Sequence, residues 1–328
     1  MAMFLGIDAG GSKTQALLTD KDGHLIGQGI TGNGNHQINY AEARVNIMDA
    51  CRQALESAGI TKEQVSYAYF GLSGADREPD YVILRPIFEE MGFPNYEFTC
   101  DTMIAMRAGT SRAYGAVIIS GTGFNSAAKN KNGDELQYGG FGFLYGDGQG
   151  AGADLAVHAY RSAIRAWDGR ERRPTILNKL VPEHLGYSSI EAMYNHMLDQ
   201  QIHPPLELAK LVFEAAAKED VVAISILKEA GDEHGIAVNA LIDRLHMQNE
   251  AFDIVLAGSV LTKGSTPHMI QAIEARVSKL APKATIVKLE IEPVIGAVMS
   301  AMDSHGLLIT AEIDARLRAI KFHKGAII

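Results

Sequence analysis

The apolar residues at the start of the chain occur in short runs that are separated by turn residues. The pattern predicts three strands: Phe4–Asp8, Gln15–Thr19 and His24–Gly29. Gly10-Gly11 and Asp22-Gly23 are the turns between them. Ala41–Ala58 then carries apolar residues at helical spacing, and Gly59 stands where a left-handed helix cap is expected. This stretch therefore predicts a small antiparallel sheet followed by an amphipathic helix.

The next residues alternate between short apolar runs and helical patterns. A buried strand is predicted at Tyr67–Leu72, a helix at Tyr81–Met91, a strand at Tyr96–Thr99 and another helix from Thr102. The predicted order of the first part of the chain is therefore βββαβαβα, which is an α/β arrangement.

The same order begins again near Gly115. Strands are predicted at Ala116–Ser120 and Asn125–Lys129, from Glu135, at Ile254–Leu256 and at Thr285–Leu289. Long helical segments occupy much of Asp154–Asn249. We therefore expect two α/β domains, at residues 1–113 and 114–328, the second with a helical insertion. A single large α/β domain is the alternative, and the sequence leaves open whether Thr310–Ile328 packs back on the first domain.

The composition narrows the possible functions. The chain has 328 residues, of which 47% are hydrophobic, and its net charge of −9 argues against general nucleic acid binding. Its two cysteines, Cys51 and Cys100, exclude a disulfide framework, a four-thiolate zinc site and a single-chain iron–sulfur cluster. The sequence shows neither a signal peptide nor a long apolar run. We expect a cytoplasmic protein that does not enter the membrane.

Two glycine turns stand at equivalent places in the two halves, Gly10-Gly11 and Gly121-Thr122-Gly123. Such turns can point several backbone N–H groups at one polyphosphate. Asp8 precedes the first turn, and a carboxylate beside phosphates is favourable mainly when Mg²⁺ lies between them. An ordinary tight hairpin is the alternative for either turn alone. A Walker loop is disfavoured, because Ser12 intervenes before Lys13-Thr14 and a hairpin follows instead of a helix.

Asp101 lies where a predicted strand gives way to a helix, at the sheet edge where open α/β folds bind their ligands. It could serve only as a helix N-cap, or it could accept the proton of an attacking hydroxyl in a kinase. Ser73-Gly74-Ala75-Asp76 ends the neighbouring strand, so its polar groups are expected to line the same crevice.

The segment Gly139–Asp147 is rich in glycine and carries interleaved aromatic residues. This composition suits the stacking of a sugar ring against exposed backbone amides, and a plain wide turn is the alternative. The loop Asn33-Gly34-Asn35-His36 could supply side-chain amides to sugar hydroxyls.

Together these motifs resemble the N-acetylglucosamine kinases of the BadF/BadG/BcrA/BcrD ATPase family, within the actin, hexokinase and Hsp70 superfamily. The resemblance covers nearly the whole chain. The motifs that carry it are Gly6–Thr14, Asn35-His36, Leu72–Asp76, Asp101, Ser120–Asn125, Gly139–Gly142 with Gly146-Asp147, and Ala257-Gly258-Ser259. The family implies a ribonuclease-H-like fold in each domain, with ATP and Mg²⁺ in the cleft between the domains, and phosphoryl transfer to the sugar 6-hydroxyl.

Carried over to this sequence, the resemblance implies that Asp101 is the general base and that Asp8 serves the metal. The positions expected to hold the amino sugar are Asn35, Asp76, Asn125, Gly140, Phe141, Gly142 and Asp147. The positions expected to hold ATP are Gly10, Gly11, Ser12, Lys13, Thr14, Gly121, Thr122, Gly123, Gly258 and Ser259, with Ala216 at the adenine end.

The sequence departs from the family in three places. Gly148-Gln149-Gly150 follows Asp147 where Glu-Gly-Ser is common, Phe141 replaces a tryptophan, and Phe124 stands where a small polar residue is usual. These changes leave the sugar open, so glucosamine and N-acetylmuramic acid are alternative acceptors to N-acetylglucosamine. An ATPase activator of a reductase or dehydratase and a non-catalytic sugar sensor are alternatives from other classes. We also expect a homodimer.

Overall fold

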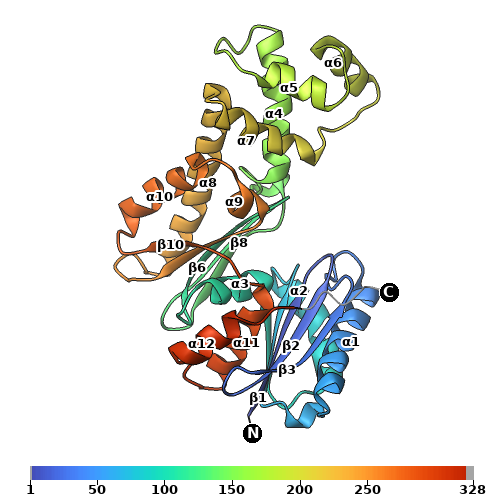
Figure 1. The fold of residues 1–328 in the computed structure, drawn as a ribbon, viewed down its shortest axis with the longest axis vertical. Helices are drawn as coiled ribbons and strands as arrows, with labels where there is room; N and C mark the ends of the chain where they lie inside the picture. The colour runs from blue at the N-terminus through green and yellow to red at the C-terminus, as the bar shows by residue number, and fades with distance from the viewer. Residues whose placement is uncertain (1, 323–328) are drawn as a thin grey trace.

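The computed structural model describes residues 2–322. In the first lobe, shown at the bottom of Figure 1, five strands form one sheet. The strands are β1 (Met3–Ala9), β2 (Thr14–Asp20), β3 (Leu25–Thr31), β4 (Tyr67–Leu72) and β5 (Tyr96–Cys100). The helices of this part of the chain are α1 (Tyr40–Ala58), the 3-10 turn η1 (Lys62–Gln64), α2 (Glu78–Met91) and α3 (Asp101–Gly109).

A second five-stranded sheet lies in the other lobe (Figure 1). Its strands are β6 (Gly115–Ser120), β7 (Phe124–Lys129), β8 (Glu135–Gly139), β9 (Asp253–Ala257) and β10 (Thr285–Lys288). Its helices and 3-10 turns are η2 (Phe143–Tyr145), α4 (Gly152–Trp167), α5 (Leu177–His184), α6 (Ile190–Asp199), η3 (Leu206–Leu208), α7 (Ala209–Ala217), α8 (Val221–Arg244), α9 (Ser259–Lys263) and α10 (His268–Leu280). Two more helices follow, α11 (Pro293–Ser304) and α12 (Ala311–Arg318).

The two sheets have the same topology. The strand order is β3-β2-β1-β4-β5 in the first sheet and, starting from the corresponding edge, β8-β7-β6-β9-β10 in the second. In each sheet the first three strands are antiparallel, and the fourth strand runs parallel to the first. The fifth strand is parallel to the fourth. The predicted duplication of an α/β unit is therefore confirmed.

Two helices connect the lobes by packing across them. Met103 and Met106 of α3 belong to the apolar core under the second sheet, while Ile104 of the same helix belongs to the core that α11 forms on the first sheet. The two helices cross closely, because a Cβ atom at Gly296 of α11 would lie only 1.9 Å from the carbonyl oxygen of Ile104. The helix after each sheet therefore packs against the sheet of the other half.

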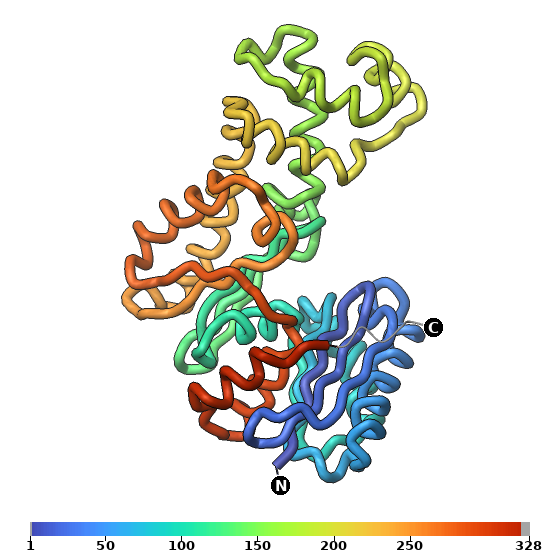
Figure 2. Tube along the Cα trace, viewed as in Figure 1, coloured from blue at the N-terminus to red at the C-terminus, as the bar shows by residue number. Residues whose placement is uncertain are grey.

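The end of the described chain returns to the first domain, as the red segment in Figure 2 shows. Leu317 of α12 is fully buried with Phe4 and Leu17 of the first sheet. The division at residues 113 and 114 stays a prediction. From these contacts we propose that residues 293–322 belong to the first domain.

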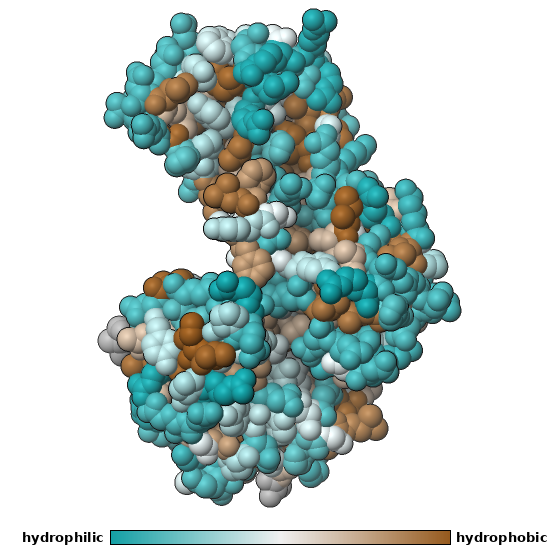
Figure 3. Space-filling model, turned by 180° about the vertical axis from the view of Figure 1, so that it is seen from behind, coloured by the Kyte–Doolittle hydropathy of each residue, from teal (hydrophilic) through white to brown (hydrophobic). Residues whose placement is uncertain are grey.

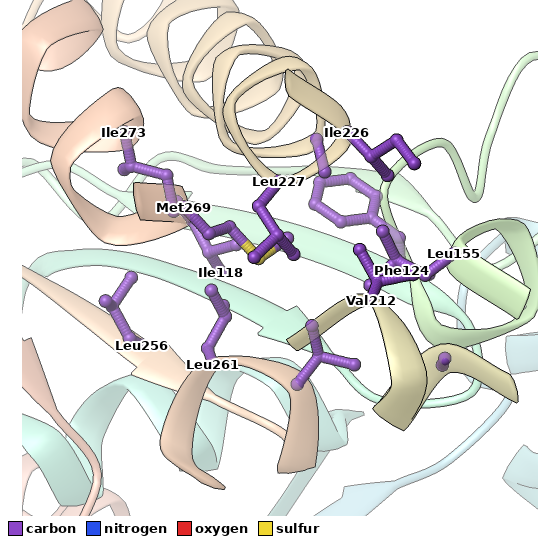
Figure 4. Packing of buried hydrophobic residues seen from close by; sticks show 14 of the residues in the cluster. Ile118, Phe124, Leu155, Val212, Ile226, Leu227, Leu256, Leu261, Met269 and Ile273 are labelled. Carbon is purple, nitrogen blue, oxygen red and sulfur yellow. The ribbon is translucent and has the colours of Figure 1, made fainter. Parts of the chain in front are cut away.

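The largest core lies between the second sheet and the helices that cover it, and Figure 4 shows its centre. Phe124 points into this core, where its ring lies 4.7 Å from that of His234. Phe124, which stands where a small polar residue is usual in the family, is therefore part of the apolar core and is only 9% exposed. None of the helices in residues 2–322 is long and apolar enough to cross a bilayer.

The helix predicted from Tyr81 begins three residues earlier, at Glu78. Pro79 suits the first turn of a helix, and the carboxylate of Asp80 accepts a hydrogen bond of 3.0 Å from the backbone N–H of Arg77. α2 thus starts two residues after Asp76, which stays in the preceding loop.

Candidate functional site

A cavity of about 1090 Å³ lies between the two lobes, and Figure 3 shows the molecule hollowed between them. Its walls include Lys13 from the turn between β1 and β2, Gln15 of β2, and Gly258 and Ser259 from the second half of the chain. Residues predicted to hold ATP from opposite halves of the sequence therefore meet in this cavity.

The first glycine turn is a tight hairpin. The backbone N–H of Gly10 donates to the carbonyl of Lys13 at 2.9 Å, and Gly11 and Ser12 are exposed at its tip. Lys13 forms an ion pair of 2.9 Å with Glu292, the residue before α11. The turn is thereby linked to the segment that leads back from the second lobe.

The second glycine turn borders another cavity of about 440 Å³. Gly121 and Thr122 line this cavity together with Phe213, and it shares Ser259 and Lys263 with the first cavity. A Cβ atom at Gly121 or Gly123 would meet no described atom within 4 Å, and neither glycine has a positive φ. Protein packing therefore does not require glycine there, and the open space suits a closely approaching ligand.

Two of the residues predicted to hold ATP, Thr14 and Ala216, are buried in the protein and line neither cavity. Thr14 is fully buried, and its hydroxyl donates to the carbonyl of Gly32 at 3.0 Å. Ala216 is 1% exposed and belongs to the core of the second lobe, because that side of α7 faces the neighbouring helices. The α7 residues that line the second cavity are Ala209, Lys210 and Phe213. The structure thus does not place Ala216 at either cavity.

Asp8 is held near the end of β1, between Gln15 of β2 and Gly71 of β4. Burial and the carboxylate of Asp101 raise the pKa of Asp8 to about 7, while the positive charge of Lys13 acts in the opposite direction. Burial and the nearby acidic groups outweigh the positive charge of Lys13 at Asp8. A carboxylate in such surroundings suits a bound cation, so Asp8 fits the predicted metal role.

Mg²⁺ is commonly held by one or two carboxylates together with substrate phosphates. Across residues 2–322, no group of three or more His, Cys, Asp or Glu side chains is arranged to hold a metal ion. Asp8 could therefore hold Mg²⁺ only as part of such a shared arrangement.

Asp101 is the first residue of α3, and Cys100 occupies the N-cap position. Asp101 is therefore not the N-cap, although its carboxylate still lies in the first turn, where the helix dipole favours negative charge. Burial raises the pKa of Asp101, and hydrogen bonds from Cys100 and Ser73 oppose that rise.

Asp76 lies beside Asp101 and is contacted from the second lobe. Its Oδ1 accepts a hydrogen bond of 2.5 Å from Nε2 of Gln137 on β8. Oδ1 also lies 3.4 Å from the thiol of Cys100. Asp76, in the loop after β4, thus contacts both the start of α3 and the second sheet.

The predicted sugar residues Asn35, Asn125 and Gly140 surround this pair of carboxylates. Nδ2 of Asn35 donates to the hydroxyl of Ser73 at 3.3 Å. A Cβ atom at Gly140 would lie 3.1 Å from Oδ2 of Asp76 and 3.6 Å from Nδ2 of Asn125. Oδ1 of Asn125 is buried without a described hydrogen-bond partner, so it remains available as an acceptor.

The remaining predicted sugar residues lie on an exposed loop. The backbone N–H of Phe141 donates to the carboxylate of Asp147 at 3.2 Å, which closes the loop around Gly142. The guanidinium of Arg77, from the first lobe, lies 5.6 Å from the centre of the Phe141 ring. The loop therefore reaches across the cleft toward the end of β4.

Several residues at the site were not identified from the sequence. Gln137 lies in the strand predicted from Glu135, for which no end was predicted. Lys263 lies a few residues after the Ala257-Gly258-Ser259 motif. Cys100 was considered only as a possible ligand of an iron–sulfur cluster. Direct adjacency to Asp101 was the available signal for Cys100. The pairing of Gln137 with Asp76 carried no local signal, because the two residues come from different sheets.

Comparison with known proteins finds relatives that match most of the length of the chain. The N-acetylmuramic acid/N-acetylglucosamine kinase of Clostridium acetobutylicum is 28% identical over 305 residues, which cover 92% of this chain and 98% of that protein. The N-acetyl-D-glucosamine kinase of Dictyostelium discoideum is 26% identical over 317 residues, with 92% and 98% covered.

Solved structures share the fold. A structure from Chromobacterium violaceum has a TM-score of 0.64 at 21% identity, and covers 90% of this chain and 98% of its own. A ROK family glucokinase from Streptomyces griseus has a TM-score of 0.55 at 16% identity, with 92% and 99% covered. At the level of sequence, the model of the BadF/BadG/BcrA/BcrD ATPase family matches residues 5–301. The chain therefore belongs to the BadF/BadG/BcrA/BcrD ATPase family.

Proposed function

We propose that the chain is an ATP-dependent kinase that phosphorylates the 6-hydroxyl of an amino sugar. The observation that carries this proposal is the position of Asp101. Its carboxylate lies at the head of α3, beside Asp76, and the second lobe contributes Gln137 to the same cluster. The cavity between the lobes, bordered by the first glycine turn, offers room for a nucleotide.

In this proposal Asp101 accepts the proton of the attacking hydroxyl. Asn35, Asp76 and Asn125 orient the acceptor through hydrogen bonds, and the loop of Phe141 covers it. Backbone N–H groups of the glycine turns bind phosphate oxygens, while Lys13 supplies positive charge. Mg²⁺ held by Asp8 would neutralise negative charge on the transferring phosphoryl group. The residues thus act mainly by positioning and by exclusion of water.

We propose N-acetylglucosamine as the first acceptor to test, with N-acetylmuramic acid and glucosamine as alternatives. The names of the Clostridium and Dictyostelium relatives support an N-acetylated sugar. A glucosamine kinase of Vibrio cholerae that is 26% identical over 262 residues supports the free amine as an alternative. The buried, unpartnered Oδ1 of Asn125 suits an amide N–H donor. We also propose that the protein is cytoplasmic and homodimeric, and light scattering of the purified chain tests the dimer.

A coupled assay of ADP release across these sugars, N-acetylmannosamine and glucose, with and without Mg²⁺, tests the function. We expect Mg²⁺-dependent ADP release with at least one amino sugar, and a sugar 6-phosphate identified by NMR. If no sugar raises turnover above the rate with ATP alone, the kinase proposal is wrong. Sugar-independent ATP hydrolysis would favour the ATPase activator, and sugar binding without turnover would favour the sensor.

A further inference from the structure

Cys100 lies between the two acidic side chains of the proposed acceptor site. It is the last residue of β5 and the N-cap residue of α3, and it is 1% exposed. Its Sγ lies 3.3 Å from Oδ1 of Asp101 and 3.4 Å from Oδ1 of Asp76. Both distances allow an S–H···O hydrogen bond.

The thiol keeps its proton in this environment. Burial, followed by the negative charges of Asp101 and Asp76, raises the pKa of the Cys100 thiol well above its ordinary value. A protonated thiol is a hydrogen-bond donor, whereas a thiolate would only add a third negative charge. Cys100 is therefore a donor and not a nucleophile.

A thiol has one proton, so the two carboxylates compete for it. Oδ1 of Asp76 already accepts a hydrogen bond of 2.5 Å from the amide of Gln137, which is a stronger donor than a thiol. Asp101 has no such amide contact among the described side chains, and its other side-chain donor is the hydroxyl of Ser73. The hydrogen bond from the thiol therefore contributes more to the position of Asp101 than to that of Asp76.

We propose that Cys100 is a positioning residue, whose S–H group holds the carboxylate of Asp101 in the orientation needed to accept the proton of the acceptor hydroxyl. This inference rests on the proposed kinase function. It also explains how two carboxylates can lie side by side, because the thiol contacts both and fills the space between them. A well-oriented base is effective only when its direction is fixed before the substrate arrives.

Cys100→Ala and Cys100→Ser form a matched pair for the test, because the side chains differ mainly by one hydroxyl donor. For the alanine variant we expect kcat to fall about tenfold, with the KM for ATP changed by less than about twofold. For the serine variant we expect kcat within about threefold of the wild type. A role in packing alone would not produce this rescue by serine.

Cys51→Ala is the control for loss of a buried thiol, since Cys51 lies in the apolar core under α1, away from the cleft. We expect lower thermal stability and an unchanged kcat. Equal kcat values for the alanine and serine variants at Cys100, beside an active wild type, would overturn the role of Cys100 alone. A wild type that phosphorylates no sugar would overturn the proposed function, and this inference with it.

Discussion

The side-chain amide of Gln137 donates a hydrogen bond of 2.5 Å to Oδ1 of Asp76, and this bond joins the second sheet to the loop after β4 of the first. The proposed acceptor site is therefore built by both lobes. Because the donor and acceptor lie in different halves of the chain, the bond also fixes the relative position of the two sheets at this edge of the cleft.

Gln137→Leu keeps much of the side-chain volume and removes the donor to Asp76. We expect the KM for the sugar to rise about tenfold, because a hydrogen bond to a charged group is worth about 1.5–3 kcal/mol. The KM for ATP should be nearly unchanged. Gln248→Leu is the control, since the amide of Gln248 bonds Asp243 at 2.6 Å outside the cleft. Equal effects of the two variants on the sugar KM would contradict the prediction.

Asp101→Asn replaces the proposed base by an amide that cannot accept a proton in the reaction. We expect kcat for sugar phosphorylation to fall by at least about 100-fold. Calorimetric titration with a non-hydrolysable ATP analogue should show nearly wild-type affinity, because the glycine turns and Lys13 are untouched. Near-normal turnover of this variant would remove Asp101 from the mechanism.

Gly258→Ala should destabilise the protein by about 3 kcal/mol or more. Gly258 has φ +81° and ψ 153°, a region that suits glycine almost alone, and a Cβ atom there would lie 2.3 Å from the carbonyl oxygen of Ser120. Gly306→Ala is the control, since Gly306 has φ +80° but no described atom within 4 Å of the added Cβ.

We expect the control to lose only about 1–2 kcal/mol, which is the cost of a left-handed backbone conformation. Urea unfolding followed by circular dichroism measures both variants. A loss at Gly258 no larger than that at Gly306 would show that the contact with Ser120 relaxes without cost.

We expect His234 to make the stability of the protein depend on pH. Burial lowers the pKa of His234 from 6.5 to about 3. Between these values the unfolded chain binds a proton at this residue and the folded chain does not, so the free energy of unfolding decreases as the pH falls through this window. Within it, His234 contributes about 1.4 kcal/mol for each pH unit.

His234→Leu should therefore show a shallower loss of stability than the wild type between pH 6.5 and the lower limit of folding. Urea unfolding at several pH values measures the slope. His203→Leu, at an exposed position before η3, is the control and should keep the wild-type slope. A wild-type slope in the His234 variant would contradict the prediction.

Local residue patterns were enough to predict most of the fold. The strand Tyr67–Leu72 has the predicted bounds, and Gly59 has the left-handed conformation expected of a helix cap, with φ 66°. Periodicity and turn chemistry act over a few residues, so they can be recognised without tertiary contacts. The repeated order of elements was also sufficient to predict the duplicated α/β unit.

Candidate residues next to a strand end or a glycine turn could be found in the same way. Asp8, Asp101 and Gly121 each stand beside a local feature that explains why they were chosen. Ala216 had only a run of alanines as its signal, and the packing of α7 buries it in the core. Which face of a helix is buried depends on the elements that pack against it, and those elements are distant in the sequence.

Residue patterns were therefore enough to predict most of the elements, their order, the duplication and the residues at the ends of the strands. Three features became visible only in the folded chain: α11 packs against the first sheet, Gln137 bonds to Asp76, and Cys100 lies between two carboxylates. The physical reason is that local conformation depends on neighbouring residues, whereas burial, charge interactions and cross-lobe hydrogen bonds depend on distances set only when both sheets are in place.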